Sequence, residues 1–490
     1  MKKKILIYLQ RDWGINIGHK LAILFKDKLD CSIGAIVSKR ATYDNLKQHQ
    51  NTLYNFFLYF DEIVENPKKF LKGDKIDLED VCKRLGVNTV WDLVQSLRNH
   101  VKSYKDKYYY GFKQNVHDED IVDLICATFK VCQKIEKDFS PDIIILPNFV
   151  SLQHIFLSIF FNKLNRKVLS FSTIGTENIG IFVNNYQEDK SSFITKYNEL
   201  NFKEFSLSRY KEVKFLQDSF YEKIRNSKII LDNIKFRDFL IFFKKIYLSF
   251  NRQNLVKKVG SSIDHISFGL VVRDFFSKIV NINFIKKTAF SEINNINKFI
   301  YLPLQFQPEA NIDVLCSFFN NQLETARQIA MKLPYDYTLV VKDHPRMYGL
   351  RSKSYLEKII RTPNVKLVSY QTPNFEILKK TKLVIAFSGA STILEAAIMK
   401  VPVIQLGISG VSSSLPNVFC FNDLINLDKK ILNILQKELF NEDYDKKLAN
   451  YFIAALENGF DLLNYNNLWN WKGGDINKLF TSIVQELNVK

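Results

Sequence analysis

The sequence predicts an α/β protein with two doubly wound domains that face each other across a cleft, joined by a basic helical insertion. Three observations predict this architecture. The chain has 490 residues, which exceeds the size at which a single hydrophobic core stops growing, so two domains are expected. Short apolar runs alternate with helical periodicity in the first and in the last third of the chain. Between about 200 and 290 these strand signals give way to aromatic, basic helical sequence.

The first predicted domain covers residues 1–190. Its opening run, KILIYL at 4–9, is typical of a buried strand, the following HKLAILFKDKL of a helix, and SIGAIVS of a second strand. This order forms a βαβ unit. Further strands are predicted at 142–148 and 167–175, with a helix between them, and STIGTEN at 172–178 ends the last of these strands near the cleft. The acidic HDED at 117–120 precedes an apolar run, so we interpret it as the start of a helix and not as a metal site.

Residues 191–295 are predicted to form a basic helical region. Positions 222–288 carry 14 Lys and Arg residues against 5 Asp and Glu residues, about half of the formal charge of +18. One interpretation is a set of amphipathic helices that bind anionic lipid headgroups. The alternative is a helical subdomain whose aromatic stripe faces a core and whose basic face is solvated. The apolar runs are far shorter than the ~20 residues of a membrane-spanning helix, so no span is predicted.

The second predicted domain covers residues 296–425. FIYLPL at 299–304, YTLVVKD, VKLVS, KLVIAFS and VPVIQLG are predicted strands, and helical segments separate them. Pro or Gly stands at most of the junctions, which favours a second doubly wound sheet. The remaining residues, 426–490, are predicted to be mostly helical.

The composition narrows the choice of compartment and ligand. Six cysteines are scattered without CxxC pairing, which argues against a zinc site or a disulfide framework and favours a reducing cytoplasm. We therefore expect no metal and no cofactor. The basic N-terminus is followed by only a short apolar run without a small-residue cleavage site, so it is interpreted as a strand and not as a signal peptide. The excess of positive charge favours an anionic partner.

Two motifs follow predicted strands of the second domain. In open α/β sheets ligands bind at the carboxyl ends of the strands, where helix N-termini present free N–H groups to anions. The turn SGAS at 388–391 opens a helix, so a phosphate can approach its backbone while Ser388, Ser391 and Thr392 donate hydrogen bonds. Glu395 lies one turn further on, where it can accept from ribose hydroxyls. The alternative is an ordinary N-cap with an acid in the first turn.

The second motif is KDHPR at 342–346. Pro345 ends the preceding strand and fixes the direction of His344, whose imidazole can donate to a phosphate. Lys342 and Arg346 add positive charge beside it. A single histidine in such a place is more often structural, so the interpretation depends on its combination with SGAS.

The order HP, SGAS, EA and PVIQLG resembles the nucleotide-binding half of GT-B glycosyltransferases, which pair two Rossmann-like domains. It is most similar to the bacterial capsule polysaccharide biosynthesis family, which includes Kdo and nonulosonate transferases. The resemblance covers roughly 299–410 and implies that His344 and the turn residues Ser388, Gly389, Ser391 and Thr392 hold the phosphate of a CMP-activated acidic sugar. Lys400 stands where that family more often has a glycine.

A second stretch, YLPLQFQPEAN at 301–311, resembles the segment that follows the first strand of the C-terminal domain in the same family. This resemblance implies that Gln305 and Glu309 line the active site, with Glu309 as a catalytic carboxylate where retaining relatives have Asp. In the first domain, RDWGINIGHK places Asp12, Asn16 and His19 after a strand, on the acceptor side. That stretch lacks the GxGxxG pattern, and a plain strand–helix turn is the alternative.

Together these observations predict a metal-independent glycosyltransferase. It is expected to move an acidic sugar from a CMP-linked nucleotide sugar onto a bacterial surface polysaccharide or its lipid-linked precursor. The expected location is the cytoplasm, with an anionic membrane surface as a partner and without nucleic acid. Two alternatives stay open: a sugar-nucleotide epimerase of similar fold, and a non-catalytic, membrane-associated scaffold of capsule assembly.

Overall fold

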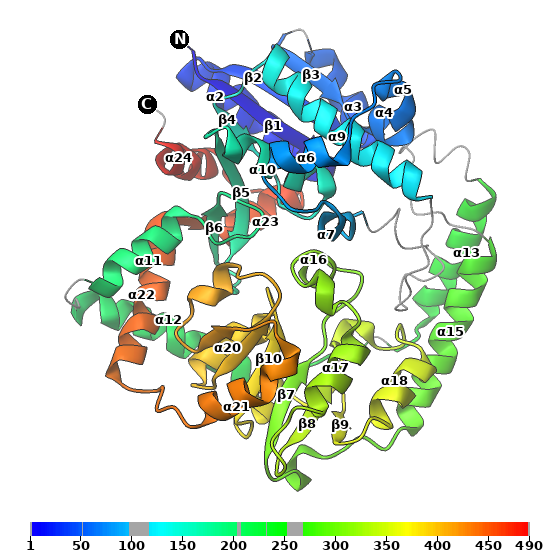
Figure 1. Ribbon diagram of the computed structural model, residues 1–490, viewed down its shortest axis with the longest axis vertical. Helices are drawn as coiled ribbons and strands as arrows, with labels where there is room; N and C mark the ends of the chain where they lie inside the picture. The colour runs from blue at the N-terminus through cyan, green and yellow to red at the C-terminus, as the bar shows by residue number, and fades with distance from the viewer. Residues whose placement is uncertain are drawn as a thin grey trace.

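The computed structural model describes residues 2–50, 52–97, 117–202, 207–231, 233–251 and 268–488. Within them the chain forms two β-sheets with helices packed on both faces, drawn one above the other in Figure 1. The predicted fold class, two doubly wound α/β domains, is confirmed.

The first sheet has seven strands in the order β13-β6-β5-β4-β1-β2-β3. The pairs among β1 to β5 are parallel, as the βαβ pattern predicts, whereas β6 and β13 are each antiparallel to their neighbour. Its strands are β1 (Lys4–Gln10), β2 (Ser32–Ser38), β3 (Phe56–Tyr59), β4 (Ile143–Ile145), β5 (Lys167–Thr173), β6 (Ile179–Val183) and β13 (Gly459–Asp461).

Helices of very different lengths cover this sheet. They are α1 (Arg11–Trp13), α2 (His19–Leu29), α3 (Arg40–Leu46), α4 (Asp61–Glu65), α5 (Pro67–Leu71), α6 (Leu78–Leu85), α7 (Trp91–Val94), α9 (Asp118–Asp138) and α10 (Leu152–Lys163). Helix α9 begins within HDED with three acids in its first turn, where carboxylates interact favourably with the helix dipole. The interpretation of HDED as a helix start is confirmed. No group of His, Cys, Asp and Glu suited to a metal ion occurs in the described part of the chain.

The second sheet has six parallel strands in the order β12-β11-β10-β7-β8-β9. Numbered from its own first strand, this is the doubly wound order, and the strand order reverses between β7 and β10. Ligands of such sheets bind at that switch point. Its strands are β7 (Phe299–Pro303), β8 (Thr338–Lys342), β9 (Val365–Val368), β10 (Leu383–Phe387), β11 (Val403–Leu406) and β12 (Val418–Cys420). Its helices are α16 (Ala310–Asp313), α17 (Gln322–Ala330), α18 (Lys353–Ile360), α19 (Asn374–Leu378), α20 (Ser391–Ile398) and α21 (Leu427–Leu435).

The C-terminal segment returns to the first domain. Helix α22 (Glu442–Asn458) begins against the second domain, where the Tyr444 hydroxyl donates to the Ala397 carbonyl over 2.6 Å. Strand β13 then pairs with β6, and α23 (Leu462–Trp469) and α24 (Ile476–Leu487) pack beside the first sheet. The indole N–H of Trp13 donates to the Tyr465 hydroxyl over 2.9 Å. The first core is therefore completed by residues between 459 and 488, at the far end of the chain.

In the described parts of the predicted basic helical region, the α-helices form two separate pairs. Helices α11 (Ser192–Phe202) and α12 (Leu207–Arg225) pack against α22, beside the junction of the domains. Helices α13 (Phe236–Phe250) and α15 (Phe268–Lys287) form an antiparallel hairpin at the edge of the second domain, on the right of Figure 1. Among the described residues, no helix combines the length and the apolar character that a membrane crossing requires.

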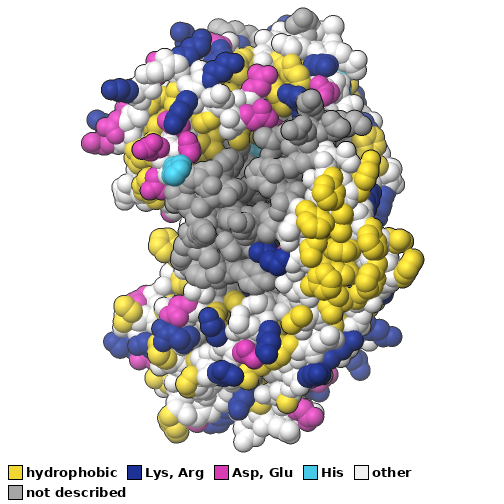
Figure 2. Space-filling model, turned by 90° about the vertical axis from the view of Figure 1, so that its right-hand side faces the viewer, with side chains coloured by type: hydrophobic (Ala, Val, Ile, Leu, Met, Phe, Trp, Pro, Cys, Tyr) yellow, Lys and Arg dark blue, Asp and Glu magenta, His cyan; other side chains and the backbone are white. Residues whose placement is uncertain are grey.

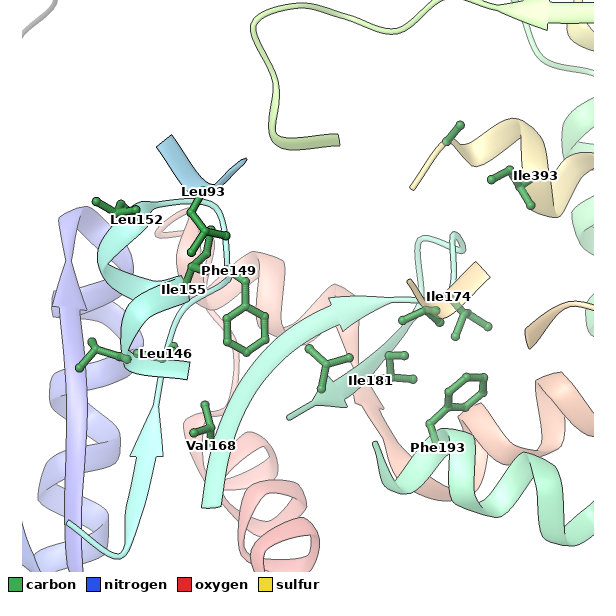
Figure 3. Close-up of a cluster of buried hydrophobic side chains, with 14 of the residues drawn as sticks. Leu93, Leu146, Phe149, Leu152, Ile155, Val168, Ile174, Ile181, Phe193 and Ile393 are labelled. Atoms are coloured by element: carbon green, nitrogen blue, oxygen red, sulfur yellow. The ribbon is translucent and has the colours of Figure 1, made fainter. Parts of the chain in front are cut away.

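One apolar cluster continues from the first domain into the second. Figure 3 shows Ile174, at the end of β5, between side chains of the first sheet and Ile393 of α20. Gly175 lies beside Leu394, and its φ of +97° belongs to the left-handed region that favours glycine. This packing joins the domains behind α20, so the loops that precede α20 face the cleft between them.

Candidate functional site

The loops that follow β7, β8 and β10 meet at the switch point of the second sheet. Asn311, on α16, donates from Nδ2 to the Gly389 carbonyl over 3.1 Å. The Phe306 ring lies edge-on to the His344 ring with 6.1 Å between the ring centres, and the Arg346 guanidinium lies 5.8 Å from the Phe306 ring centre. The structure therefore brings the stretches QFQPEAN, KDHPR and SGAS into one place.

The SGAS turn presents the N-terminus of α20 without a side-chain cap. Gly389 has a φ of +76°, and a β-carbon there would lie 3.0 Å from Asn311 Oδ1, so glycine is required. The N-cap residue is Ala390, which has no hydrogen-bonding side chain. The Ser388 hydroxyl is buried and has no hydrogen-bond partner among the described residues. Ser391 is exposed and Thr392 is buried. The N-cap alternative is therefore wrong, and the turn offers free donors to an anion.

His344, which contacts the β7 loop through Phe306, is a neutral hydrogen-bond donor. Its Nδ1 accepts from the Arg346 backbone N–H over 3.1 Å. Because Nδ1 accepts, the neutral ring carries its proton on Nε2. Burial is the main cause that lowers the pKa of His344, which keeps the ring neutral near pH 7. The partly buried imidazole is thus prepared to donate from Nε2.

A buried ion pair fixes the loop that carries His344. Arg351 donates from Nε to Asp343 Oδ1 over 2.9 Å, and the Tyr370 hydroxyl donates to Asp343 Oδ2 over 2.7 Å. The His344 backbone N–H also donates to Asp343, over 2.8 Å. Arg351 Nη2 reaches the Gln305 carbonyl over 2.8 Å and so joins the β8 loop to the β7 loop. Sequence reasoning missed Asp343 and Arg351, and the only signal was an acid directly after a buried strand.

Lys342 and Glu395 are linked to each other through Asn374. Lys342 is buried and donates from Nζ to Asn374 Oδ1 over 2.9 Å, and Asn374 Nδ2 donates to Glu395 Oε2 over 3.0 Å. Burial lowers the pKa of Lys342 to about 8 and raises the pKa of Glu395. Both side chains thus have protein partners beneath the site. Their predicted roles toward phosphate and ribose stay predictions.

The loop after β7 is held by amide side chains. The Gln305 backbone N–H donates to Gln322 Oε1 over 2.6 Å, and Gln307 Nε2 donates to Asp313 Oδ1 over 3.2 Å. Gln305 itself is buried. Glu309 is the partly buried N-cap residue of α16, the helix that points toward the first domain in Figure 1. Its catalytic role stays a prediction.

The three predicted residues of the first domain lie around the turn after β1. Asn16 is 1% exposed and donates to the Trp469 carbonyl over 3.0 Å, so it ties this turn to α23. His19 shares a 2.7 Å hydrogen bond with the Tyr54 hydroxyl, and burial, followed by the charge of His49, lowers its pKa to about 4. Asp12 is exposed. The contacts of Asn16 and His19 are not with the SGAS turn, and an acceptor role stays a prediction.

Glu188 is a candidate that sequence reasoning missed. It belongs to the loop after β6, whose Gln187 carbonyl accepts from the Gly410 N–H over 3.0 Å across the domain junction. Gly410 lies against Ser388, since a β-carbon on it would be 2.9 Å from Ser388 Oγ. The Ser172 hydroxyl, within STIGTEN, donates to Glu188 Oε2 over 3.0 Å, and burial raises the pKa of Glu188 to about 7. A carboxyl group whose pKa is raised to about 7 thus lies one residue from a backbone contact to Gly410, which packs against Ser388 of the SGAS turn.

A cavity of about 820 Å³ lies between the domains next to this turn. Its walls are mainly apolar and include Leu93, Ile155 and Tyr186 of the first domain. Cys316 and Gly407 line it from the second domain, and the Ser388 N–H donates to Cys316 Sγ over 3.2 Å. The cavity therefore has walls from both domains and reaches the SGAS turn through Cys316, while the predicted site residues do not line it.

The two doubly wound domains and the cleft between them define the GT-B architecture. No sequence family and no curated protein matches the chain. Among solved structures, the chain is similar to the KpsC β-Kdo 2,4 transferase of Thermosulfurimonas dismutans (11% identity, 64% of this chain and 79% of that chain, TM-score 0.34). It is also similar to UDP-GlcNAc 2-epimerase of Methanocaldococcus jannaschii in complex with UDP-GlcNAc and UDP (13%, 93% and 99%, TM-score 0.26). A third similar structure is MnaA of S. aureus with UDP (10%, 97% and 99%, TM-score 0.27). These similarities concern the fold.

Proposed function

We propose that the chain is a glycosyltransferase that uses a nucleotide-sugar donor. The observation that carries this proposal is the uncapped N-terminus of α20 at the switch point, with the buried, unpartnered Ser388 hydroxyl beside it. Free N–H groups and the positive end of the helix dipole favour a phosphate there. The adjoining cavity between the domains gives room for a sugar and an acceptor.

In this proposal the reaction is driven by stabilisation of the leaving nucleotide. The bond between the anomeric carbon and the phosphate oxygen breaks, and the electron pair leaves with the nucleotide. His344 donates from Nε2 to the phosphate, while the α20 N-terminus and the exposed Arg346 oppose its developing charge. Glu309 on α16 acts on the sugar side, either at the anomeric carbon or by accepting the proton of the acceptor hydroxyl. Lys342 does not contact the phosphate in this proposal; it adds positive charge below the site and holds Asn374 by a hydrogen bond.

The finer assignment is a CMP-linked acidic sugar and a bacterial surface polysaccharide or its lipid-linked precursor. The support is the order of the HP, SGAS, EA and PVIQLG motifs, which resembles the capsule polysaccharide family. This part of the proposal includes independence from a metal ion, because the charge on the leaving group is opposed by protein donors.

A thermal-shift screen with CMP, UDP, GDP and their sugars tests the proposal. A ligand at about 100 times its Kd adds about 2.7 kcal/mol of apparent stability, so one nucleotide class should raise the Tm of the parent protein. Gly389→Val should abolish the shift, because the branched side chain occupies the approach to the turn. Gly73→Val is the matched control, since Gly73 has a φ of +83° and no atom within 4 Å of an added β-carbon.

His344→Ala should lower the affinity for the same nucleotide by about tenfold to a hundredfold, since a hydrogen bond to a charged group contributes roughly 1.5–3 kcal/mol. His344→Gln keeps an N–H donor and should recover part of the affinity, as measured by calorimetry. No shift with any nucleotide, or equal shifts for the parent and Gly389→Val, would contradict the proposal. Conversion of a UDP-sugar to its epimer without an acceptor would show that the chain is a sugar-nucleotide epimerase and not a glycosyltransferase.

A further inference from the structure

The α13–α15 hairpin exposes an unusual number of apolar side chains. On α13, Phe236, Phe243, Tyr247 and Phe250 are 79%, 61%, 67% and 73% exposed, and no described residue of that helix is buried. We define the hairpin patch as Phe236, Phe239, Leu240, Phe243, Tyr247 and Phe250 of α13 with Phe276 and Val280 of α15, all of them exposed. Figure 2 shows this region of the molecule as one continuous hydrophobic area. Apolar patches of this kind mark interaction sites on soluble proteins.

Most of the patch is not used to hold the hairpin together. The contact between the two helices is made chiefly by Phe242 and Phe275, which stack with 4.3 Å between ring centres. Two patch members contribute at its margin, since the Phe239 ring lies 5.1 Å from that of Phe275 and the Phe250 ring 5.5 Å from that of Phe268. The α13 members of the patch recur every three or four residues, so they form a stripe along one face of the helix. This stripe lies beside the seam between the helices and is turned to solvent.

Positive charge accompanies the stripe. The two helices carry seven Lys and Arg residues against two acids. The acids are neutralised within the hairpin, because Asp238 lies 3.5 Å from Lys278 and Asp274 lies 2.7 Å from Arg273. The other basic residues are Arg237, Lys244, Lys245, Lys286 and Lys287. In Figure 2 Lys and Arg side chains border the hydrophobic area.

We propose that the hairpin patch docks on the surface of an anionic lipid bilayer. The aromatic and aliphatic side chains of α13 enter the boundary between headgroups and acyl chains, and the surrounding Lys and Arg residues bind lipid phosphates. With 15 residues, α13 is about 22 Å long, enough to lie along the interface. A second copy of this chain fits the patch poorly, because it would place one cationic hairpin against another.

This docking does not depend on the proposed nucleotide chemistry. It adds a property that the proposed function alone does not require, namely retention of the enzyme at the surface where a lipid-linked acceptor is located. Failure of one proposal therefore leaves the other intact, since vesicle binding is measured without any nucleotide.

Co-sedimentation with phosphatidylcholine vesicles, with and without phosphatidylglycerol, tests the proposal. The parent should bind the anionic vesicles at low salt and lose binding as salt screens the charges. The partition coefficient of the triple variant Phe243→Ser/Tyr247→Ser/Phe250→Ser should be lower than that of the parent by about tenfold or more. Lys244→Glu/Lys245→Glu should lower the partition coefficient about fivefold or more for each reversed charge. Phe215→Ser and Tyr335→Ser remove exposed aromatic rings elsewhere and should bind like the parent.

Insertion is tested separately from adsorption. Tryptophan emission of Phe243→Trp should be quenched by brominated lipids, whereas that of Tyr335→Trp should not. Melting temperatures of the serine variants should lie close to that of the parent, because all the replaced side chains are largely exposed and, among the described residues, only Phe250 has a ring contact with the other helix, to Phe268. The proposal is overturned if the parent ignores anionic vesicles at low salt or if the triple variant binds them equally well. A dimer in solution that the triple variant disperses, together with absent vesicle binding, would assign the patch to a second copy of the chain.

Discussion

At the scale of single residues, Glu188 combines an unusual backbone conformation with a buried carboxyl group near the SGAS turn. Its backbone has a φ of +55°, in the left-handed region, and its carboxylate accepts from Ser172. Burial raises its pKa from 4.5 to about 7. A carboxyl group that titrates near neutral pH is suited to general acid–base chemistry, and this group lies one residue from the contact between the two domains.

The raised pKa of Glu188 predicts how stability depends on pH. The native state binds the Glu188 proton more tightly than the unfolded state, so the contribution to stability is complete below about pH 4.5 and is lost as the pH rises through 7. Glu188→Gln should remove this dependence. Urea midpoints of the parent and the variant should therefore converge at low pH, while the variant becomes relatively more stable at pH 8. Glu79→Gln, an exposed glutamate of α6, is the control, and parallel curves for parent and Glu188→Gln would contradict the prediction.

At the scale of elements, the loop between β8 and α18 is shaped by charges that never reach solvent. The side chains of Asp343 and Arg351 are 1% and 2% exposed, and Arg351 also holds the β7 loop through the Gln305 carbonyl. Two loops that contribute to the site thus share one buried cation. An unpaired buried charge in that position would be costly, so Asp343 and Arg351 stay together. Asp343 also accepts from the His344 backbone N–H, and the ion pair therefore fixes the position of His344.

Removal of one partner from this network should be strongly destabilising. Arg351→Met leaves Asp343 buried and unpaired, and we expect a loss of about 3–5 kcal/mol in the free energy of unfolding. Urea denaturation followed by circular dichroism measures this loss. The double variant Asp343→Asn/Arg351→Met should recover part of it, since the uncompensated charge is gone. If the single variant unfolds like the parent, the ion pair has no structural role.

At the scale of the whole molecule, the C-terminal segment completes the first domain. Phe460 of β13 packs against Phe182 with 4.9 Å between ring centres and against Phe171 with 5.6 Å. Gly180 on β6 makes this approach possible, because a β-carbon there would overlap the Phe460 ring. The chain therefore crosses the domain junction again through α22 and closes the first core from the far end of the sequence.

Removal of the Phe460 ring should lower the stability of the first domain, although Phe460 lies near the C-terminus. Phe460→Ala is expected to cost about 3–5 kcal/mol, the usual range for a buried phenylalanine. Trp13 lies in the same core and bonds to Tyr465, so its fluorescence during urea unfolding reports the loss. Leu463→Ala, at an exposed position of α23, should change stability by about 0.5 kcal/mol or less. An equal effect of the two substitutions would show that β13 is dispensable.

The candidate site could be predicted in part because its motifs follow strands directly. SGAS and KDHPR come immediately after apolar runs, and the carboxyl ends of β8 and β10 carry them to the same edge of the sheet. The partners could not be predicted, because Asn311, Arg351 and Asn374 reach the site from helices and loops without a motif. Lys400 stands where the family that the sequence resembles more often has a glycine; it adopts a φ of +54°, in the left-handed region, and forms an ion pair with Asp445.

The sequence by itself determined the two doubly wound sheets, the helical character of the insertion and the order of the loops that carry the site, because these follow from local periodicity and turn residues. Only the tertiary structure decided that β13 joins the first sheet and that the loop of Glu188 approaches the SGAS turn. It alone decided that the aromatic stripe of α13 faces solvent and not a core. The physical reason is that an apolar stripe has the same spacing whether it is buried or exposed, and that contacts between distant residues leave no local pattern in the chain.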